Sequence, residues 1–199
     1  MKLEKRAEEK RQEILEIVKN TIAPHFSNPD QLSIEIINYF CIITPPEIDP
    51  MIYLLTLKPG GLGGARSSKP GNIWLNWRRL LIDGAESILT IVGAAAVPWL
   101  IPLAGLVVWN KLWSLLSIKI DERHAAVIWS MWKNRDEKNC IENDKILDLV
   151  NKELSEYNRP KMTEKELKDI LKDLEKMECI EAIDKNKWWL REWVKVTYE

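Results

Sequence analysis

The amino-acid sequence predicts a mainly α-helical protein, with helices at the N-terminus, an apolar transmembrane helical hairpin in the middle and a small α+β domain at the C-terminus. Two features of composition indicate this arrangement. All eight glycines lie between Gly60 and Gly105, and no Asp, Glu, Lys or Arg occurs from Ser87 to Asn110. The middle of the chain therefore differs from both flanks. We divide the 199 residues into segments 1–57, 58–72, 73–120 and 121–199.

Segment 1–57 is expected to hold two helices. The first is highly charged and is stopped by Pro24, because proline has no backbone N–H with which to continue a helix. The stretch SNPDQLSIEIINYFCII predicts the second, since Asn28 suits the N-cap and Pro29 the first helical position. The stretch MIYLLTL, residues 51–57, is compatible with a strand or a buried helical turn, and periodicity does not decide between them.

Segment 58–72 is expected to be a basic, glycine-rich linker beside the membrane. Its glycines suggest a phosphate-binding loop, but that motif requires Ser or Thr directly after the lysine, and here Lys69 is followed by Pro70. A nucleotide-hydrolysis site is therefore not predicted in this segment.

The uncharged run within segment 73–120 reaches the roughly 20 residues that cross a bilayer as one helix. One interpretation is a single span from Ile88 to Trp109, and the other is a hairpin with arms 74–97 and 102–120. Basic residues lie on both sides of the run, so a single span would have no clear orientation, whereas a hairpin would leave both flanks in the cytosol. The alternative is a soluble helical bundle with this run in its core. Tryptophans flank the run on both sides, as in an interfacial belt, and favour the membrane.

Polar residues recur at steps of three and four along each arm, which places them in one stripe on each helix. Ionisable side chains on a membrane helix usually face a protein interior or a water-filled path. We therefore expect hairpins from several subunits to line a channel. The predicted pore-lining residues are Asn76, Arg79, Asp83, Glu86, Thr90, Asn110, Ser114 and Ser117.

Segment 121–199 is predicted to contain three helices followed by a β-hairpin. The helices are DERHAAVIWSMWKNRD, ENDKILDLVNKELSEYN and MTEKELKDILKDLEKM, and Thr163 and Glu166 form a capping box at the start of the third. Two short strands are expected around a turn at residues 184–187. This order of elements resembles a winged-helix domain. One feature departs from the resemblance, because the turn after the third helix usually carries glycine and here it is Glu178-Cys179.

The winged-helix resemblance implies binding of DNA by the third helix. Exposed positions of that helix carry both signs of charge, whereas affinity for duplex DNA requires an excess of Lys and Arg facing the phosphates. A protein partner, or an anionic nucleotide or oligonucleotide, is therefore expected in preference to duplex DNA. The predicted contact residues are Lys161, Lys165, Lys168, Lys172, Lys187, Trp189 and Arg191.

Catalytic, cofactor and metal sites are not predicted. His25 and His124 are far apart and outside any metal-ligand spacing, and no Ser or Cys stands in a recognisable nucleophile context. Three cysteines without a short spacing, and an N-terminus without an apolar signal core, indicate a reduced protein facing the cytosol. We therefore expect that the chain is not an enzyme.

Together these patterns predict a membrane-associated homo-oligomeric effector: an ion-conducting channel in the cell membrane, controlled by a cytosolic winged-helix-like sensor. In layout alone it is similar to small membrane effectors of prokaryotic antiviral systems. The alternative is a membrane-tethered or soluble, cytoplasmic winged-helix regulator that binds DNA or a partner protein.

Overall fold

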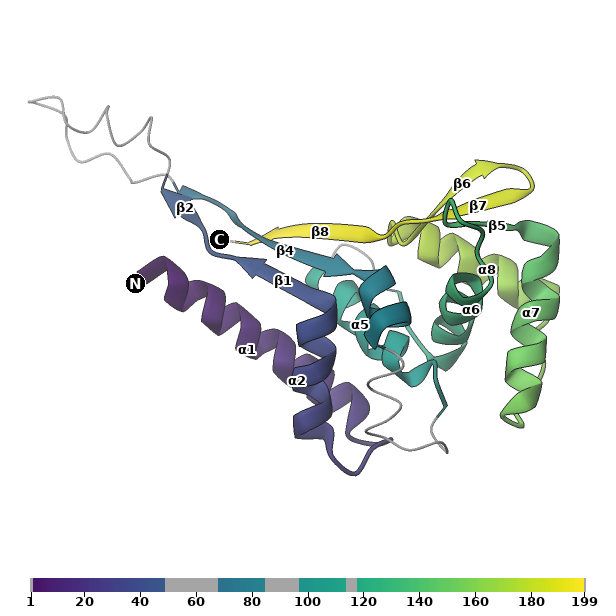
Figure 1. The fold of residues 1–199 in the computed structure, drawn as a ribbon, viewed down its shortest axis with the longest axis horizontal. Helices are drawn as coiled ribbons and strands as arrows, with labels where there is room; N and C mark the ends of the chain where they lie inside the picture. Colours follow the sequence, from purple (N-terminus) through teal and green to yellow (C-terminus); the bar gives the residue numbers. More distant parts are fainter. Residues whose placement is uncertain (1, 49–67, 85–96, 114–117, 199) are drawn as a thin grey trace, which may run out of the picture.

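The computed structural model describes residues 2–48, 68–84, 97–113 and 118–198. Figure 1 shows a long sheet with helices α1, α2 and α5 on one side of it. Helices α6, α7 and α8 and a smaller sheet lie beyond one end of the long sheet, at the right of the view. The helices are α1 (Lys2–Ile22), α2 (Pro29–Phe40), the π-helix η1 (Arg79–Asp83), α5 (Leu100–Trp113), α6 (Glu122–Lys133), α7 (Asn143–Glu156) and α8 (Glu164–Lys176). The strands are β1 (Cys41–Thr44), β2 (Glu47–Ile48), β3 (Ser68–Lys69), β4 (Gly71–Asn76), β5 (Cys140–Glu142), β6 (Ile180–Asp184), β7 (Lys187–Leu190) and β8 (Trp193–Tyr198).

Strands β1, β4 and β8 form an antiparallel sheet in that order, which we call the central sheet. Cys41 lies opposite Leu75, and Leu75 lies opposite Val194, so these three side chains point to the same face. All three are buried, on the side where α1 and α2 contact the sheet. Gly71 lies opposite Tyr198, and a Cβ at this position would come within 2.6 Å of the Tyr198 ring, so the close approach requires glycine.

The two N-terminal helices form as expected. Helix α1 buries Val18 and Ile22, which lie four residues apart on one face. Helix α2 begins at Pro29 after Asn28, as predicted, although the Asn28 side chain makes no capping hydrogen bond. The two helices pack against each other and against the central sheet, and thereby enclose one side of the core.

The predicted transmembrane hairpin is wrong. Among the described residues, no helix is both long enough and apolar enough to cross a membrane. The beginning of the expected first arm lies in strand β4 and in η1. The second arm is represented by α5, whose 14 residues extend about 21 Å at 1.5 Å per residue, well short of the ~30 Å hydrocarbon core of a bilayer.

The pore hypothesis depended on this hairpin, and its set of pore-lining residues stays a prediction. Two of the described members, Asn76 and Asn110, make local hydrogen bonds. The side-chain oxygen of Asn76 accepts a hydrogen bond from the backbone N–H of Arg79 at 2.7 Å. The amide of Asn110 donates to the carbonyl of Ile118 at 2.8 Å. Asp83 is exposed at the end of η1. The other predicted pore residues, Glu86, Thr90, Ser114 and Ser117, lie outside the described residues.

Helix α5 lies in the centre of the protein core. It contacts α1, α6 and η1, and both Leu106 and Trp109 are fully buried. The Nε1–H of Trp109 donates to the carbonyl of Met177, just after α8, at 2.6 Å, so α5 is bonded directly to the C-terminal segment. Trp77 is fully buried as well, although the sequence placed it in an interfacial belt. The described part of the apolar run is therefore buried, as expected from the alternative in which this run forms part of a protein core.

The C-terminal segment contains the three helices and the β-hairpin that the sequence predicts, together with the unexpected strand β5. Strands β5, β7 and β6 form an antiparallel sheet in that order. The capping box of α8 is confirmed, because the Glu166 N–H donates to the Thr163 hydroxyl and the Thr163 N–H donates to the Glu166 carboxylate, both at 3.3 Å. The hairpin turns at Asn186, whose N–H donates to the Asp184 carboxylate at 2.7 Å.

Strand β8 was not expected, and it joins the C-terminal segment to the rest of the protein. It follows β7 and pairs with β4 from Asn76, opposite Trp193, to Gly71, opposite Tyr198. The division into four segments stays a prediction. The structure adds that a strand of segment 121–199 completes a sheet whose other strands come from the first half of the chain.

The chain leaves α8 through Glu178, whose φ of 55° is in the left-handed region where helices commonly end on glycine. The N–H of Cys179 donates to the carbonyl of Leu174 at 3.0 Å and closes the helix end. The Glu178 carboxylate lies 3.4 Å from the guanidinium of Arg191. This is the position at which the sequence departs from the winged-helix pattern.

Candidate functional site

Helix α8 buries one narrow stripe and exposes the rest of its surface. Its apolar residues recur at steps of three and four, and each is at least 95% buried: Leu167, Ile170, Leu171 and Leu174. Most of the other positions are exposed and carry both signs of charge, among them Lys165, Lys168, Asp169, Lys172 and Glu175. The exposed face of α8 is therefore a mosaic of charges and not a cationic surface.

Three of the predicted contact residues are already ion-paired. Lys168 lies 2.6 Å from Glu164 within α8. Lys187, on β7, lies 2.9 Å from Asp136, and this pair lowers the pKa of the Asp136 carboxyl and raises the pKa of Lys187. The guanidinium of Arg191 lies 3.4 Å from the carboxylate of Glu178 and 2.9 Å from that of Glu181. The pairs of Lys187 and Arg191 fix the hairpin, whereas the pair of Lys168 is internal to α8. In each of the three, a carboxylate within 3.4 Å offsets the positive charge and weakens its attraction for an anion.

The other predicted contact residues remain exposed. Lys161, Lys165 and Lys172 are exposed, and they take part in none of the ion pairs between described residues. Lys165 and Lys172 lie on α8, whereas Lys161 precedes the helix. The structure therefore places Lys165, Lys168 and Lys172 along one helix, whereas Lys187 and Arg191 belong to the ion pairs that fix the hairpin.

The hairpin β6–β7 exposes large apolar side chains. Trp188 and Trp189 are adjacent on β7 and point to opposite faces, as the sequence predicts. Trp188 is partly buried, and its Nε1–H donates to the side-chain oxygen of Asn143 at 2.9 Å. Trp189 is 37% exposed and Ile183 is 56% exposed. Exposed tryptophan on a rigid hairpin is typical of residues that anchor protein–protein interfaces.

A hollow of about 260 Å³ lies between the start of α6 and the end of α7, and it is lined by Trp99, Glu122, Arg123, Leu154, Arg159 and Pro160. Its two guanidiniums face carboxylates. Arg159 lies 3.6 Å from Glu122, and Arg123 lies 3.2 Å from Glu166. An anion that entered this hollow would have to displace those carboxylates, so the hollow is a weak candidate for the anionic nucleotide considered above.

His124 is a buried polar residue, although its place at a helix start, outside any metal-ligand spacing, predicts a polar residue on the surface. It is 7% exposed, its Nδ1 lies 2.8 Å from the carboxylate of Asp121, and its Nε2 lies 3.6 Å from the carboxylate of Asp173 on α8. Burial acts to raise the pKa of Asp121. Hydrogen bonds from His124 and from two backbone N–H groups together lower this pKa by more than burial raises it, so the net shift is downward. The spacing of Asp121 and His124 at a helix start could have indicated this pair, whereas Asp173 is visible only in the fold.

Chemically reactive groups are sparse in the part of the chain that the structure describes. Burial raises the pKa of the Cys41 thiol to about 12 and raises the pKa of Cys179 as well, so neither thiol is a good nucleophile near neutral pH. No group of three or more His, Cys, Asp or Glu side chains there is arranged to hold a metal ion. The expectation that the chain is not an enzyme stays a prediction.

Comparisons of the chain with protein-family models, with curated proteins and with solved structures found no match. The chemistry of its own surface is therefore the basis on which a function can be proposed. Two features of that surface stand out: the charged mosaic on α8 and the apolar side chains of the hairpin beside it.

Proposed function

We propose that this chain is a regulator whose C-terminal segment is a winged-helix domain that binds a partner protein. The order of α6, α7, α8 and the hairpin supports the resemblance to that fold. The proposed contact surface is the exposed face of α8 together with the hairpin β6–β7, which we call the α8–hairpin surface. The observation that carries the proposal is the exposure of Trp189 and Ile183 on a hairpin that packs against a helix of mixed charge.

A protein fits this surface better than duplex DNA does. Protein interfaces are enriched in aromatic anchors surrounded by a polar rim, and Trp189 with the charges of α8 has that composition. Duplex DNA would place phosphates against Asp169 and Glu175 of the same helix, and the ion pair of Lys168 with Glu164 removes one cation from the contact.

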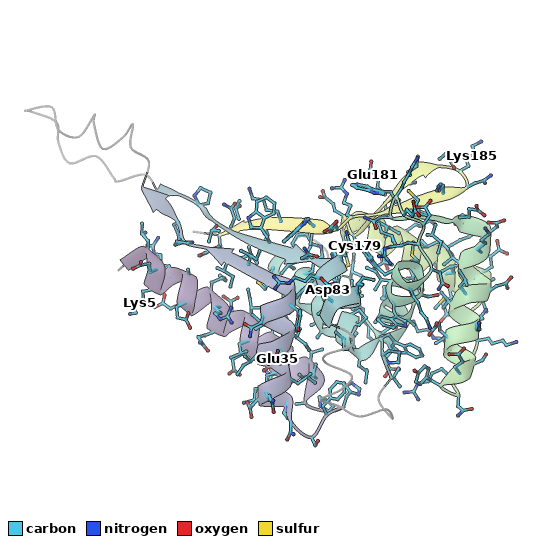
Figure 2. All side chains as sticks on the ribbon, viewed as in Figure 1. Lys5, Glu35, Asp83, Cys179, Glu181 and Lys185 are labelled. Atoms are coloured by element: carbon cyan, nitrogen blue, oxygen red, sulfur yellow. The ribbon has the colours of Figure 1, made fainter. Side chains whose placement is uncertain are left out.

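Site-specific photo-crosslinking in the cells that produce the protein tests the proposal. Figure 2 shows Lys185, at the turn of the hairpin, at the opposite end of the molecule from Lys5 on α1. A photoreactive amino acid at Lys185 or at Lys172 is expected to capture one specific protein, and the same group at Lys5 is expected not to. The captured protein, once purified, should bind the Trp189→Ala variant about ten-fold more weakly than the parent, a loss of about 1.4 kcal/mol.

The exposed apolar residue Ile34 on α2 provides the matched control, because Ile34→Ala removes comparable exposed surface away from the α8–hairpin surface. This variant should bind the partner as the parent does. Two results contradict the proposal. One is equal capture from Lys5 and Lys185. The other is nanomolar, sequence-selective binding of duplex DNA at physiological salt that is lost in Lys172→Glu.

A further inference from the structure

The face of the central sheet that points away from the helices is exposed and rich in apolar side chains. Because side chains alternate along a strand, residues next to the buried Cys41, Leu75 and Val194 point outward. Ile42 is 44% exposed and Trp193 is 40% exposed, which makes them two of the five exposed large apolar residues in the described part of the chain. We call the surface formed by Ile42, Trp74, Trp193 and Lys195 the outer face of the central sheet.

The register of the strands groups these side chains closely. Ile42 lies opposite Trp74, and Trp74 lies opposite Lys195, so the three form one row across the sheet. Trp193 occupies the next outward position on β8, diagonal to Trp74 at roughly 7–8 Å. The Lys195 ammonium lies 4.7 Å from the centroid of the Trp74 ring. Two indoles and a cation therefore lie close together on this face.

Further cations lie at the end of this face beside Trp193. The Arg78 guanidinium is exposed, 4.0 Å from the carboxylate of Glu192, the residue directly before Trp193. Burial, and then the charge of Arg78, lower the pKa of Arg135, whereas the charge of Glu192 acts to raise it, so Arg135 interacts electrostatically with both. Lys195 is exposed and takes part in none of the ion pairs between described residues. Cations thus exceed carboxylates here, although the whole chain has a formal net charge of -1.

We propose that the outer face of the central sheet binds single-stranded nucleic acid, with a base stacked on the exposed indole of Trp193 and phosphates held by Lys195 and Arg78. Proteins that bind single strands combine aromatic side chains, on which successive bases stack, with basic groups that follow the backbone. One nucleotide supplies both a flat apolar ring and an adjacent negative charge. The pairing of Trp193 with Lys195 on the same face of β8 matches those two groups.

The position of Lys195 favours this ligand over a second protein. Charged residues, and lysine in particular, are depleted from the core of protein interfaces, because burying an ammonium without a carboxylate is costly. Here Lys195 lies within the apolar surface, over Trp74, where a protein would bury it. Duplex nucleic acid is also a poorer fit, because its bases are stacked on one another and cannot stack on the indole of Trp193.

Fluorescence anisotropy of the full chain with a labelled single strand of about 20 thymidines tests the proposal. Trp193→Ala should weaken binding about ten-fold, whereas Trp193→Phe, which keeps an aromatic ring, should retain most of the affinity. Lys195→Gln should reduce the slope of log K against log salt by about 0.7, the value for one phosphate of a single strand. The matched controls are Trp189→Ala and Lys172→Gln, which remove the same residue types from the α8–hairpin surface and should leave binding unchanged.

Three results would overturn the inference. The first is no binding at about 50 mM salt, where the attraction between phosphates and cations is strong. The second is an equal loss of affinity in Trp189→Ala and Trp193→Ala, which would move the site away from the sheet. The third is self-association in light scattering that disappears in Trp193→Ala, which would show that a second copy covers the face. Because the partner-protein proposal concerns the α8–hairpin surface, its own crosslinking experiment fails or succeeds separately.

Discussion

Helices α5 and α8 are of nearly equal length, 14 and 13 residues, but they are stabilised in different ways. Helix α5 is buried on almost every side, and its contacts with α1, α6 and η1 supply its stability. Helix α8 buries one stripe and adds a capping box and surface ion pairs of its own. A helix of the first kind depends on the protein around it, and a helix of the second kind carries much of its stability in its own sequence.

The largest difference in stability between variants of the two helices is expected when a buried side chain of α5 is shortened. Leu106→Ala should lower the free energy of unfolding by about 2–5 kcal/mol, because Leu106 is fully buried and the neighbours on all sides can close the cavity only in part. Urea denaturation followed by circular dichroism measures the change. Lys172→Ala on the exposed face of α8 is the control and should change stability by less than ~0.5 kcal/mol. Equal losses in the two variants would contradict the distinction.

A smaller effect is expected from the local bonds at the start of α8. Thr163→Ala removes one half of the capping box and should cost about 1 kcal/mol. Asn28→Ala, at the start of α2, is the matched comparison, because the Asn28 side chain makes no capping hydrogen bond. It should cost clearly less in the same urea experiment. If the Asn28 variant is the less stable of the two, the cap is not what stabilises the start of α8.

The smallest effect concerns Asp121, at the start of α6 between the two helices. The pKa of Asp121 is lower in the folded protein than in the unfolded chain. Its contribution to stability is therefore present above the unfolded pKa of ~3.9, and it is lost as the pH falls through the folded pKa. Asp121→Asn should therefore reduce stability near neutral pH, with a difference from the parent that disappears in acid. Urea titrations across this pH range test the prediction, with the exposed Asp148→Asn as control. A constant difference at every pH would contradict it.

The C-terminal helices and hairpin could be predicted because their signals are local. Leu167, Ile170, Leu171 and Leu174 repeat with the period of a helix, and Thr163 marks where that helix begins. The alternation of Trp188 and Trp189 likewise needs only the period of a strand. The exposed lysines of α8 follow directly from the buried stripe, so the sequence could place that part of the candidate site.

The middle of the chain could not be predicted in the same way. An apolar run without charges suits a lipid bilayer and a protein core that surrounds it equally well, because both exclude water. Most of strand β4 was assigned to a helical arm beginning at residue 74, because Asn76 falls in the helical stripe of polar residues and the apolar run before it fits a helical turn as well as a strand. The outer face of the central sheet was missed because it depends on β4 pairing with β8, and no local pattern records a partner so distant in sequence.

The two residues between β7 and β8 have a mechanical consequence for the molecule. The N–H of Arg191 donates to the carbonyl of Cys179 at 3.0 Å, and the carbonyl of Glu192 accepts from the N–H of Trp77 at 2.9 Å. Arg191 is thus bonded to the residue directly before β6 and Glu192 to the residue directly after β4, and a fully extended chain adds at most ~3.6 Å per residue. Because only these two residues separate β7 from β8, a displacement of the hairpin would be transmitted to the central sheet, and we expect the two sheets to move together.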